Sequence, residues 1–63
     1  MMSEVQIERL ALGAALLEKD GKLYEYAGRM RNGALVFDPV KDGERLAVTE
    51  RTLMNCDAYK AVG

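Results

Sequence analysis

The sequence predicts a mainly β fold, in which a four-stranded antiparallel meander closes into a small barrel after a short N-terminal helix or irregular segment. The first observation behind this prediction is a set of three Asx-Gly pairs, Asp20-Gly21, Asn32-Gly33 and Asp42-Gly43. Such pairs favour two-residue type I′ turns, because Asn, Asp and Gly tolerate positive φ best. The second is the alternation of apolar and polar residues between the pairs. The third is the length of 63 residues, which suits one domain, 1–63.

If each Asx-Gly pair is a two-residue loop, the pairs also predict the strand register. Leu17 then faces Tyr24, and Phe37 faces both Gly28 and Val48. Directly opposed residues share a face of the sheet, and this register collects the apolar residues on one face: Ala15, Leu17, Tyr24, Tyr26, Met30, Leu35, Phe37, Leu46 and Val48. The opposite face carries Glu18, Glu25, Arg29, Arg31, Asp38 and Thr49, with Leu16, Leu23 and Val36 among them. A slip of one residue would destroy the agreement.

The N-terminal third supports two interpretations. Ser3 and Gln6 have the spacing of a capping box, and apolar residues follow at helical spacing from Ile7. Gly13 disfavours a long helix, and the first predicted hairpin requires the residues just before Asp20 to form a strand. We therefore expect a helix or irregular segment to about residue 11 and then a strand. The alternative is an α+β fold, with a helix over 4–18 packed on a three- to four-stranded antiparallel sheet.

The C-terminal third predicts a helical turn and a last strand. Thr49 can cap a short turn over 50–54. The tail 56–62 can form a short strand with Tyr59 and Ala61 on one side.

The segments LALGAALLEKDGKLYEYAG and LVFDPVKDGERLAVTERTL, within 10–53, carry a resemblance. They resemble the small SH3-like barrels of phage and transposase proteins in their turn glycines, tyrosine-rich strand and terminal leucine. The resemblance implies a fold and assigns no functional residue.

Composition excludes several classes of site. The chain has no histidine and a single cysteine, Cys56, so a structural zinc site and histidine-based triads lack their ligands and bases. The carboxylate pairs Glu18/Asp20 and Asp42/Glu44 flank turns, where acidic residues are common. We therefore expect no enzyme, no catalytic residues, no metal and no cofactor.

Charge and hydropathy indicate a soluble, cytoplasmic protein. The net charge is −1, which is neither the basic footprint of a dedicated nucleic-acid binder nor strongly acidic. Apolar residues make up 49% of the chain, too many for disorder, yet none of the runs approaches a membrane span. The start lacks a signal-peptide pattern. We expect a complete small gene product.

Five residues are candidates for partner binding: Tyr24, Glu25, Arg29, Arg31 and Asp38. The tyrosines can line a groove or pack the core with their hydroxyls at its rim. The two arginines can contact phosphate or an acidic protein surface, or simply be a solvated strand end. The acidic residues can form a patch that meets a basic partner.

We therefore expect a non-enzymatic small binding protein, a regulator or inhibitor such as phages and mobile elements encode. An anti-CRISPR-type inhibitor is one example. Its partner would be a larger protein or nucleoprotein complex, with no membrane involved, and the chain itself would be a monomer or small homo-oligomer. One alternative is a nucleic-acid-binding SH3-like module that uses Arg29, Arg31 and Tyr24. The other is a homo-oligomeric structural component.

Overall fold

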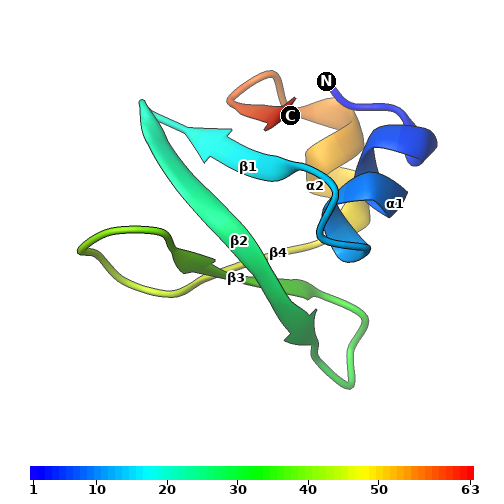
Figure 1. Cartoon of the computed structure of the whole chain (residues 1–63). Helices are drawn as coiled ribbons and strands as arrows, with labels where there is room; N and C mark the ends of the chain where they lie inside the picture. The colour runs from blue at the N-terminus through cyan, green and yellow to red at the C-terminus, as the bar shows by residue number, and fades with distance from the viewer.

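A curled antiparallel sheet and two short helices make up the chain (Figure 1). The computed structural model describes residues 1–63. The elements in chain order are α1 (Glu4–Ala11), β1 (Leu16–Lys19), β2 (Lys22–Arg29), β3 (Leu35–Pro39), β4 (Leu46–Val48), α2 (Glu50–Asn55) and β5 (Tyr59–Val62). The strand order is β4-β3-β2-β1-β5, with every neighbouring pair antiparallel. The predicted meander is confirmed, and β5 extends it beside β1. β4 and β5 do not pair, so the sheet is a half-barrel and not the closed barrel that the sequence predicted.

Both helices begin at the predicted caps. The backbone N–H of Gln6 donates to Ser3 Oγ at 3.2 Å, and the backbone N–H of Ser3 donates to Gln6 Oε1 at 2.9 Å. Thr49 caps α2 by accepting from the backbone N–H of Thr52 at 3.2 Å. Neither helix is long and apolar enough to cross a membrane.

α1 ends early, as the shorter of the two interpretations predicted. Gly13 has φ +77°, a conformation that stops a helix and suits glycine best. An N-terminal helix does pack against the sheet, but residues 16–19 belong to β1 and not to a helix over 4–18.

The first hairpin has the predicted turn and register. Asp20 and Gly21 both have positive φ, +53° and +78°, as a type I′ turn requires. Leu17 faces Tyr24, as predicted.

The second hairpin differs from the prediction in its loop and in a bulge. Met30 N–H donates to Ala34 O, and Gly33 N–H donates to Met30 O, so the loop has three residues, 31–33. Only Gly33 among them has positive φ. The register then shifts between Tyr26 and Gly28, with Ala27 as the extra residue of a β-bulge. Phe37 therefore faces Tyr26, and the predicted pairing with Gly28 is wrong.

The third hairpin also has a longer connection than predicted. Phe37 faces Leu46 and Leu35 faces Val48, a shift of two residues from the predicted Phe37–Val48 pair. A shift of two leaves each side chain on its predicted face, since the side-chain period of a strand is two. Asp42 has no positive φ, so Asp42-Gly43 is not a type I′ turn.

The core lies between the concave face of the sheet and the two helices. We call this concave side the inner face; its strand residues are Leu17, Tyr24, Tyr26, Leu35, Phe37, Leu46, Val48 and Ala61. From the helices, Ile7, Leu10 and Leu53 complete the core. Met30, predicted to be in the core, is 47% exposed because it lies at the start of the longer loop. Tyr59 and Ala61 pack against the core, as predicted.

Candidate functional site

The face of the sheet turned away from the core is a mixed apolar and charged surface. We call it the outer face and define it by Leu16, Glu18, Leu23, Glu25, Val36, Asp38, Val40, Ala47, Lys60 and Val62. The register places these residues in cross-strand pairs, of which Leu16–Val62, Glu18–Leu23 and Val36–Ala47 are examples. Val40 lies beside Leu23, because its backbone N–H donates to Leu23 O at 2.9 Å.

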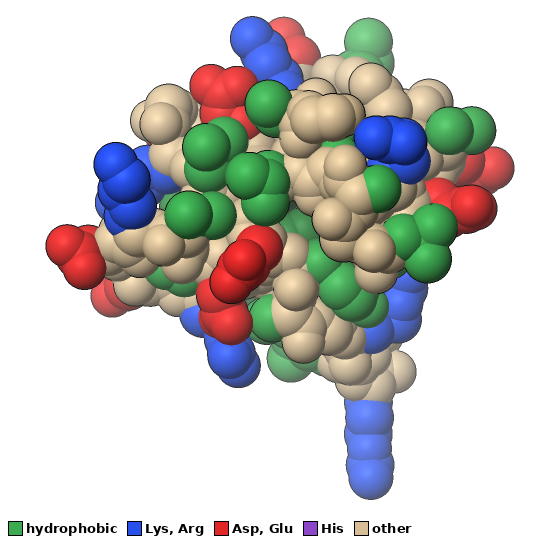
Figure 2. All heavy atoms as spheres, in the orientation of Figure 1, with side chains coloured by type: hydrophobic (Ala, Val, Ile, Leu, Met, Phe, Trp, Pro, Cys, Tyr) green, Lys and Arg blue, Asp and Glu red, His purple; other side chains and the backbone are tan.

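Apolar side chains on the outer face are exposed to solvent. Leu23, Val40 and Val62 are 39%, 48% and 40% exposed, and Leu16 and Val36 are half-buried. Figure 2 shows hydrophobic side chains gathered over the part of the molecule where Figure 1 places β1 and β2, with an acidic side chain among them. Apolar groups grouped in this way and rimmed by charges are typical of interaction surfaces.

Two carboxylates oppose each other on the outer face. Glu25 and Asp38 are direct cross-strand partners on β2 and β3. Arg45 neutralises one of them, with its Nε 2.7 Å from Asp38 Oδ1. This hydrogen bond and the carboxylate charge raise the pKa of Arg45. Neither Glu25 nor Glu18 belongs to an ion pair. The outer face therefore presents uncompensated negative charge beside apolar groups.

The five residues predicted for partner binding lie in three places. Glu25 and Asp38 are together on the outer face. Tyr24 faces Leu17 and Pro39 on the opposite side of the sheet, where it packs half-buried against the core. Tyr26 packs edge-on against Phe37, with ring centroids 6.0 Å apart. The tyrosines thus line the core and not an open groove.

Arg29 and Arg31 do not share the outer face, contrary to the prediction. The bulge at Ala27 reverses the alternation of β2, so Arg29 faces Leu35 on the helix side. There its Nη1 lies 3.0 Å from Glu50 Oε2 and donates to Gly33 O at 2.9 Å. Arg31 is exposed in the β2–β3 loop. Arg29 is therefore on the same side of the sheet as Tyr24, and Arg31 lies in the loop beyond it.

Arg45 was not among the predicted site residues. The predicted register of the third hairpin was wrong by two residues and put Ala47 opposite Asp38. The observed register brings Arg45 opposite Asp38, close enough for two hydrogen bonds of 2.7 and 3.4 Å. The opposite charges of Asp38 and Arg45 on either side of a turn were the one signal that could have indicated the pair.

Two hollows flank the sheet. One cavity lies at the end of the outer face, between the β1–β2 turn and the β3–β4 connection, with Leu23 and Val40 in its lining. A second groove lies between α1, Arg29 and Glu50 of α2. No group of three or more Cys, Asp or Glu side chains is arranged to hold a metal ion. Cys56 is a half-buried free thiol.

Comparison with known proteins adds no relative. No family model, curated protein or solved structure matches the chain. The geometry of the outer face is therefore the basis for a proposed function.

Proposed function

We propose that this chain is a non-enzymatic binding protein, a regulator or inhibitor that contacts a larger protein through the outer face. The partner surface that fits is basic, with apolar side chains beside its Lys or Arg residues. Exposed Leu23, Val40 and Val62 supply apolar contact area, and unpaired Glu18 and Glu25 supply charge. Arginine suits such a surface, since its planar guanidinium can bind carboxylates through two hydrogen bonds.

The observation that carries this proposal is the direct opposition of Glu25 and Asp38. Like charges directly opposite on a sheet are destabilising, and Arg45 offsets the charge of Asp38 alone, so Glu25 has no ion-pair partner in the fold. A basic partner would convert the repulsion into attraction, because one guanidinium or ammonium group can contact both carboxylates. Residues that cost stability while exposed are typical of binding surfaces.

We also propose that the half-barrel is an open form of the SH3-like fold. The strand order supports this, since a four-stranded meander, a short helix and a fifth strand beside the first follow the predicted order of that fold. The fold assigns no partner, so the outer face carries the functional proposal by itself.

Affinity capture from the native host tests the proposal with a matched pair of variants. Glu25→Arg reverses a charge on the outer face, whereas Asp57→Arg makes the same change in the exposed turn before β5. We expect the wild-type protein and Asp57→Arg to retain the same partner and Glu25→Arg to lose it. Retention by the wild type should weaken as salt rises, since the contact is electrostatic. A partner held equally by Glu25→Arg contradicts the proposal.

Each of the two alternative functions, nucleic-acid binding and homo-oligomeric assembly, can be tested by a separate measurement. Nucleic-acid binding predicts a fluorescence-polarisation signal with random duplex or single strands that falls steeply with salt. Arg31→Gln should weaken that signal, because Arg31 is exposed and belongs to none of the ion pairs. A homo-oligomeric structural role predicts that dilute protein sediments as more than one chain.

A further inference from the structure

β5 is the last strand at one end of the sheet and has a free edge. β1 lies beside it on one side, and no strand lies on the other, because β4 is at the opposite end (Figure 1). The backbone N–H and C=O groups along such an edge are a template for pairing with another chain. β4 has a free edge too, but it has three residues, whereas β5 has four. β5 is therefore the longer template.

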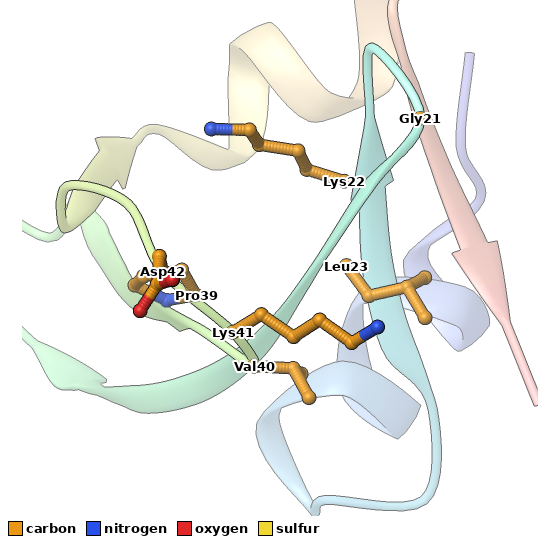
Figure 3. Close-up of a pocket in the computed structure, with 7 residues that line it drawn as sticks. All are labelled: Gly21, Lys22, Leu23, Pro39, Val40, Lys41 and Asp42. Atoms are coloured by element: carbon orange, nitrogen blue, oxygen red, sulfur yellow. The ribbon is translucent and has the colours of Figure 1, made fainter.

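The hydrogen bond between Val40 and Leu23 fixes the direction of the backbone groups across the sheet. Val40 N–H donates to Leu23 O at 2.9 Å beside the cavity shown in Figure 3, so the backbone of Leu23 points toward β3. Cross-strand pairs in an antiparallel ladder alternate between hydrogen-bonded and non-hydrogen-bonded pairs. Glu18, which opposes Leu23 on β1, is thus not bonded to it and directs its N–H and C=O groups toward β5.

Tyr59 and Ala61 are the residues of β5 whose backbone groups point to the free edge. Glu18 opposes Lys60, so the backbone of Lys60 bonds to β1. The alternation then turns the N–H and C=O groups of Tyr59 and Ala61 away from β1. The hydrogen bonds outside the helices and strands involve none of residues 57–62. Two donors and two acceptors therefore stand unpaired on alternate residues.

These unpaired groups are within reach of solvent and of another chain. Tyr59 and Ala61 are half-buried, and fully buried backbone groups are almost always paired in folded proteins. The nearest side-chain hydrogen bond along the chain, from Arg9 Nη2 to Gly63 O at 3.1 Å, lies beyond the end of β5. An extended segment satisfies N–H and C=O groups on alternate residues at once. The edge therefore fits an added strand.

Lys60 determines which strand fits this edge. If β5 of two copies paired antiparallel, Tyr59 of each copy would bond with Ala61 of the other. Lys60 would then oppose the same residue of the second copy, with Cα atoms about 4.5 Å apart. Like charges directly opposite are destabilising, and Lys60 is exposed and belongs to none of the ion pairs. An acidic residue in that position would be attracted, so the edge suits a foreign strand better than a second copy.

The neighbours of Lys60 favour apolar residues on either side of that acidic residue. Tyr59 and Ala61 pack against the core from the inner face. Residues that bond with them across the edge would share this face, since directly opposed residues lie on the same side of a sheet. The preferred strand therefore has the pattern apolar, acidic, apolar.

We propose that the free edge of β5 binds an extended segment of a partner protein as an added antiparallel strand, whose acidic residue opposes Lys60 between two apolar residues. This inference deepens the proposed function and relies on it for the partner protein. The added strand would extend the outer face beyond Lys60 and Val62, so one partner would contact both the face and its edge.

Titration with the capped peptide Ac-Ser-Thr-Val-Glu-Val-Thr-Ser-NH2, followed by amide NMR, tests the edge without a partner. We expect the amide signals of Tyr59 and Ala61 to shift most at millimolar peptide, because their N–H groups gain acceptors. N-methylation of both valines removes the donors that face β5, so it should weaken binding at least about fivefold. N-methylation of the glutamate changes an N–H that points away from β5 and should weaken binding far less.

Two proline variants give a matched comparison within the chain. Ala61→Pro removes an N–H at the free edge of β5 and leaves the ladder with β1 intact. Ala47→Pro does the same for β4, since Val36 points toward β2 like Val40 and Ala47 opposes Val36. We expect Ala61→Pro to lose the peptide-induced shifts and Ala47→Pro to bind like the wild type, with circular dichroism confirming that both fold.

The charge preference has its own measurement, which does not depend on the proline variants. The peptide with lysine in place of glutamate should bind the wild type more weakly, and Lys60→Thr should bind both peptides equally. Four results overturn the proposal: no shifts at millimolar peptide, equal binding after N-methylation of both valines, shifts confined to β4, or a dimer in sedimentation that Ala61→Pro abolishes. None of them involves Glu25, so failure of the edge and failure of the outer face in the Glu25→Arg capture can be distinguished.

Discussion

Phe37 and Asp38 are neighbours on β3 and belong to opposite faces of the sheet. Phe37 is fully buried and packs edge-on against Tyr26. Asp38 opposes another carboxylate, Glu25, and is neutralised only by Arg45 from the next connection. The inner face thus holds the groups that form the core, whereas the outer face carries exposed apolar groups and a carboxylate, Glu25, without an ion-pair partner. If the proposed function is right, the two faces divide folding from recognition.

Removing the largest inner side chain should have the largest effect. Phe37→Ala is expected to cost about 3–5 kcal/mol, which is as much as a core of this size usually supplies. We expect urea denaturation followed by circular dichroism to show no cooperative transition. Val36→Ala, one residue away on the outer face, should cost far less because Val36 is only half-buried. Cooperative, near-wild-type unfolding of Phe37→Ala would contradict the division between the faces.

The division between the faces also depends on the β2–β3 loop, which sets the register. Gly33 has φ +91°, so Gly33→Val should cost about 1–3 kcal/mol in backbone strain. Asn32→Pro removes the hydrogen bond from Ala34 N–H to Asn32 Oδ1, of 3.0 Å, and should also disrupt folding. Thermal melting measures both effects, with Arg31→Ala as the control in the same loop. Wild-type melting of both variants would show that the loop does not specify the register.

A gain in stability is expected from the outer face. Glu25→Thr removes the like-charge opposition to Asp38 and introduces a residue that favours strands, so it should stabilise the fold by about 0.2–1 kcal/mol. Chemical denaturation measures this gain, and Glu44→Thr in the exposed connection serves as the control. A loss of stability would mean that Glu25 stabilises the fold, which would contradict its assignment to a binding surface.

The smallest effect is expected at the end of the β1–β2 hairpin. The hydrogen bond and charge of Asp20, 2.9 Å away, raise the pKa of Lys19 above its ordinary value of 10.5. The resulting stabilisation is fully present below pH 10.5 and is lost as the pH rises through the raised pKa of Lys19. The melting temperatures of wild type and Lys19→Gln should therefore converge at high pH. A difference that stays constant with pH would exclude this ion pair as its cause.

Local signals in the sequence were sufficient for much of the fold. The caps at Ser3 and Thr49 and the turn at Asp20-Gly21 each depend on residues within a few positions. The other two Asx-Gly pairs do not form the predicted two-residue turns, because an Asx-Gly pair is compatible with more than one type of turn. In a type I′ turn both residues have positive φ, whereas a three-residue loop requires it only of the glycine.

Candidate site residues were predicted correctly only where the errors in loop length and register left their side chains on the predicted face of the sheet. Glu25 and Asp38 kept their predicted face and proved to be direct partners. Arg29 changed sides because of the bulge, for which Gly28, with φ +145°, is the only local sign. Lys22 and Lys41 come from separate hairpins, so their presence in the lining of one cavity depends on how the sheet curls and not on any pattern in the sequence.

The extra residue at Ala27 makes the β2–β3 hairpin a place where a change in chain length can be accommodated. A single insertion in a hairpin loop normally moves the side chains of the rest of the strand to the opposite face of the sheet. Here the three-residue loop adds one residue to a two-residue turn, and the bulge adds a second. Together the two additions shift the register by two residues, so Phe37 meets Tyr26 in place of the predicted Gly28 and stays on the core face. A change of length in this hairpin should therefore be tolerated best when two residues are gained or lost together, one in the loop and one in the bulge.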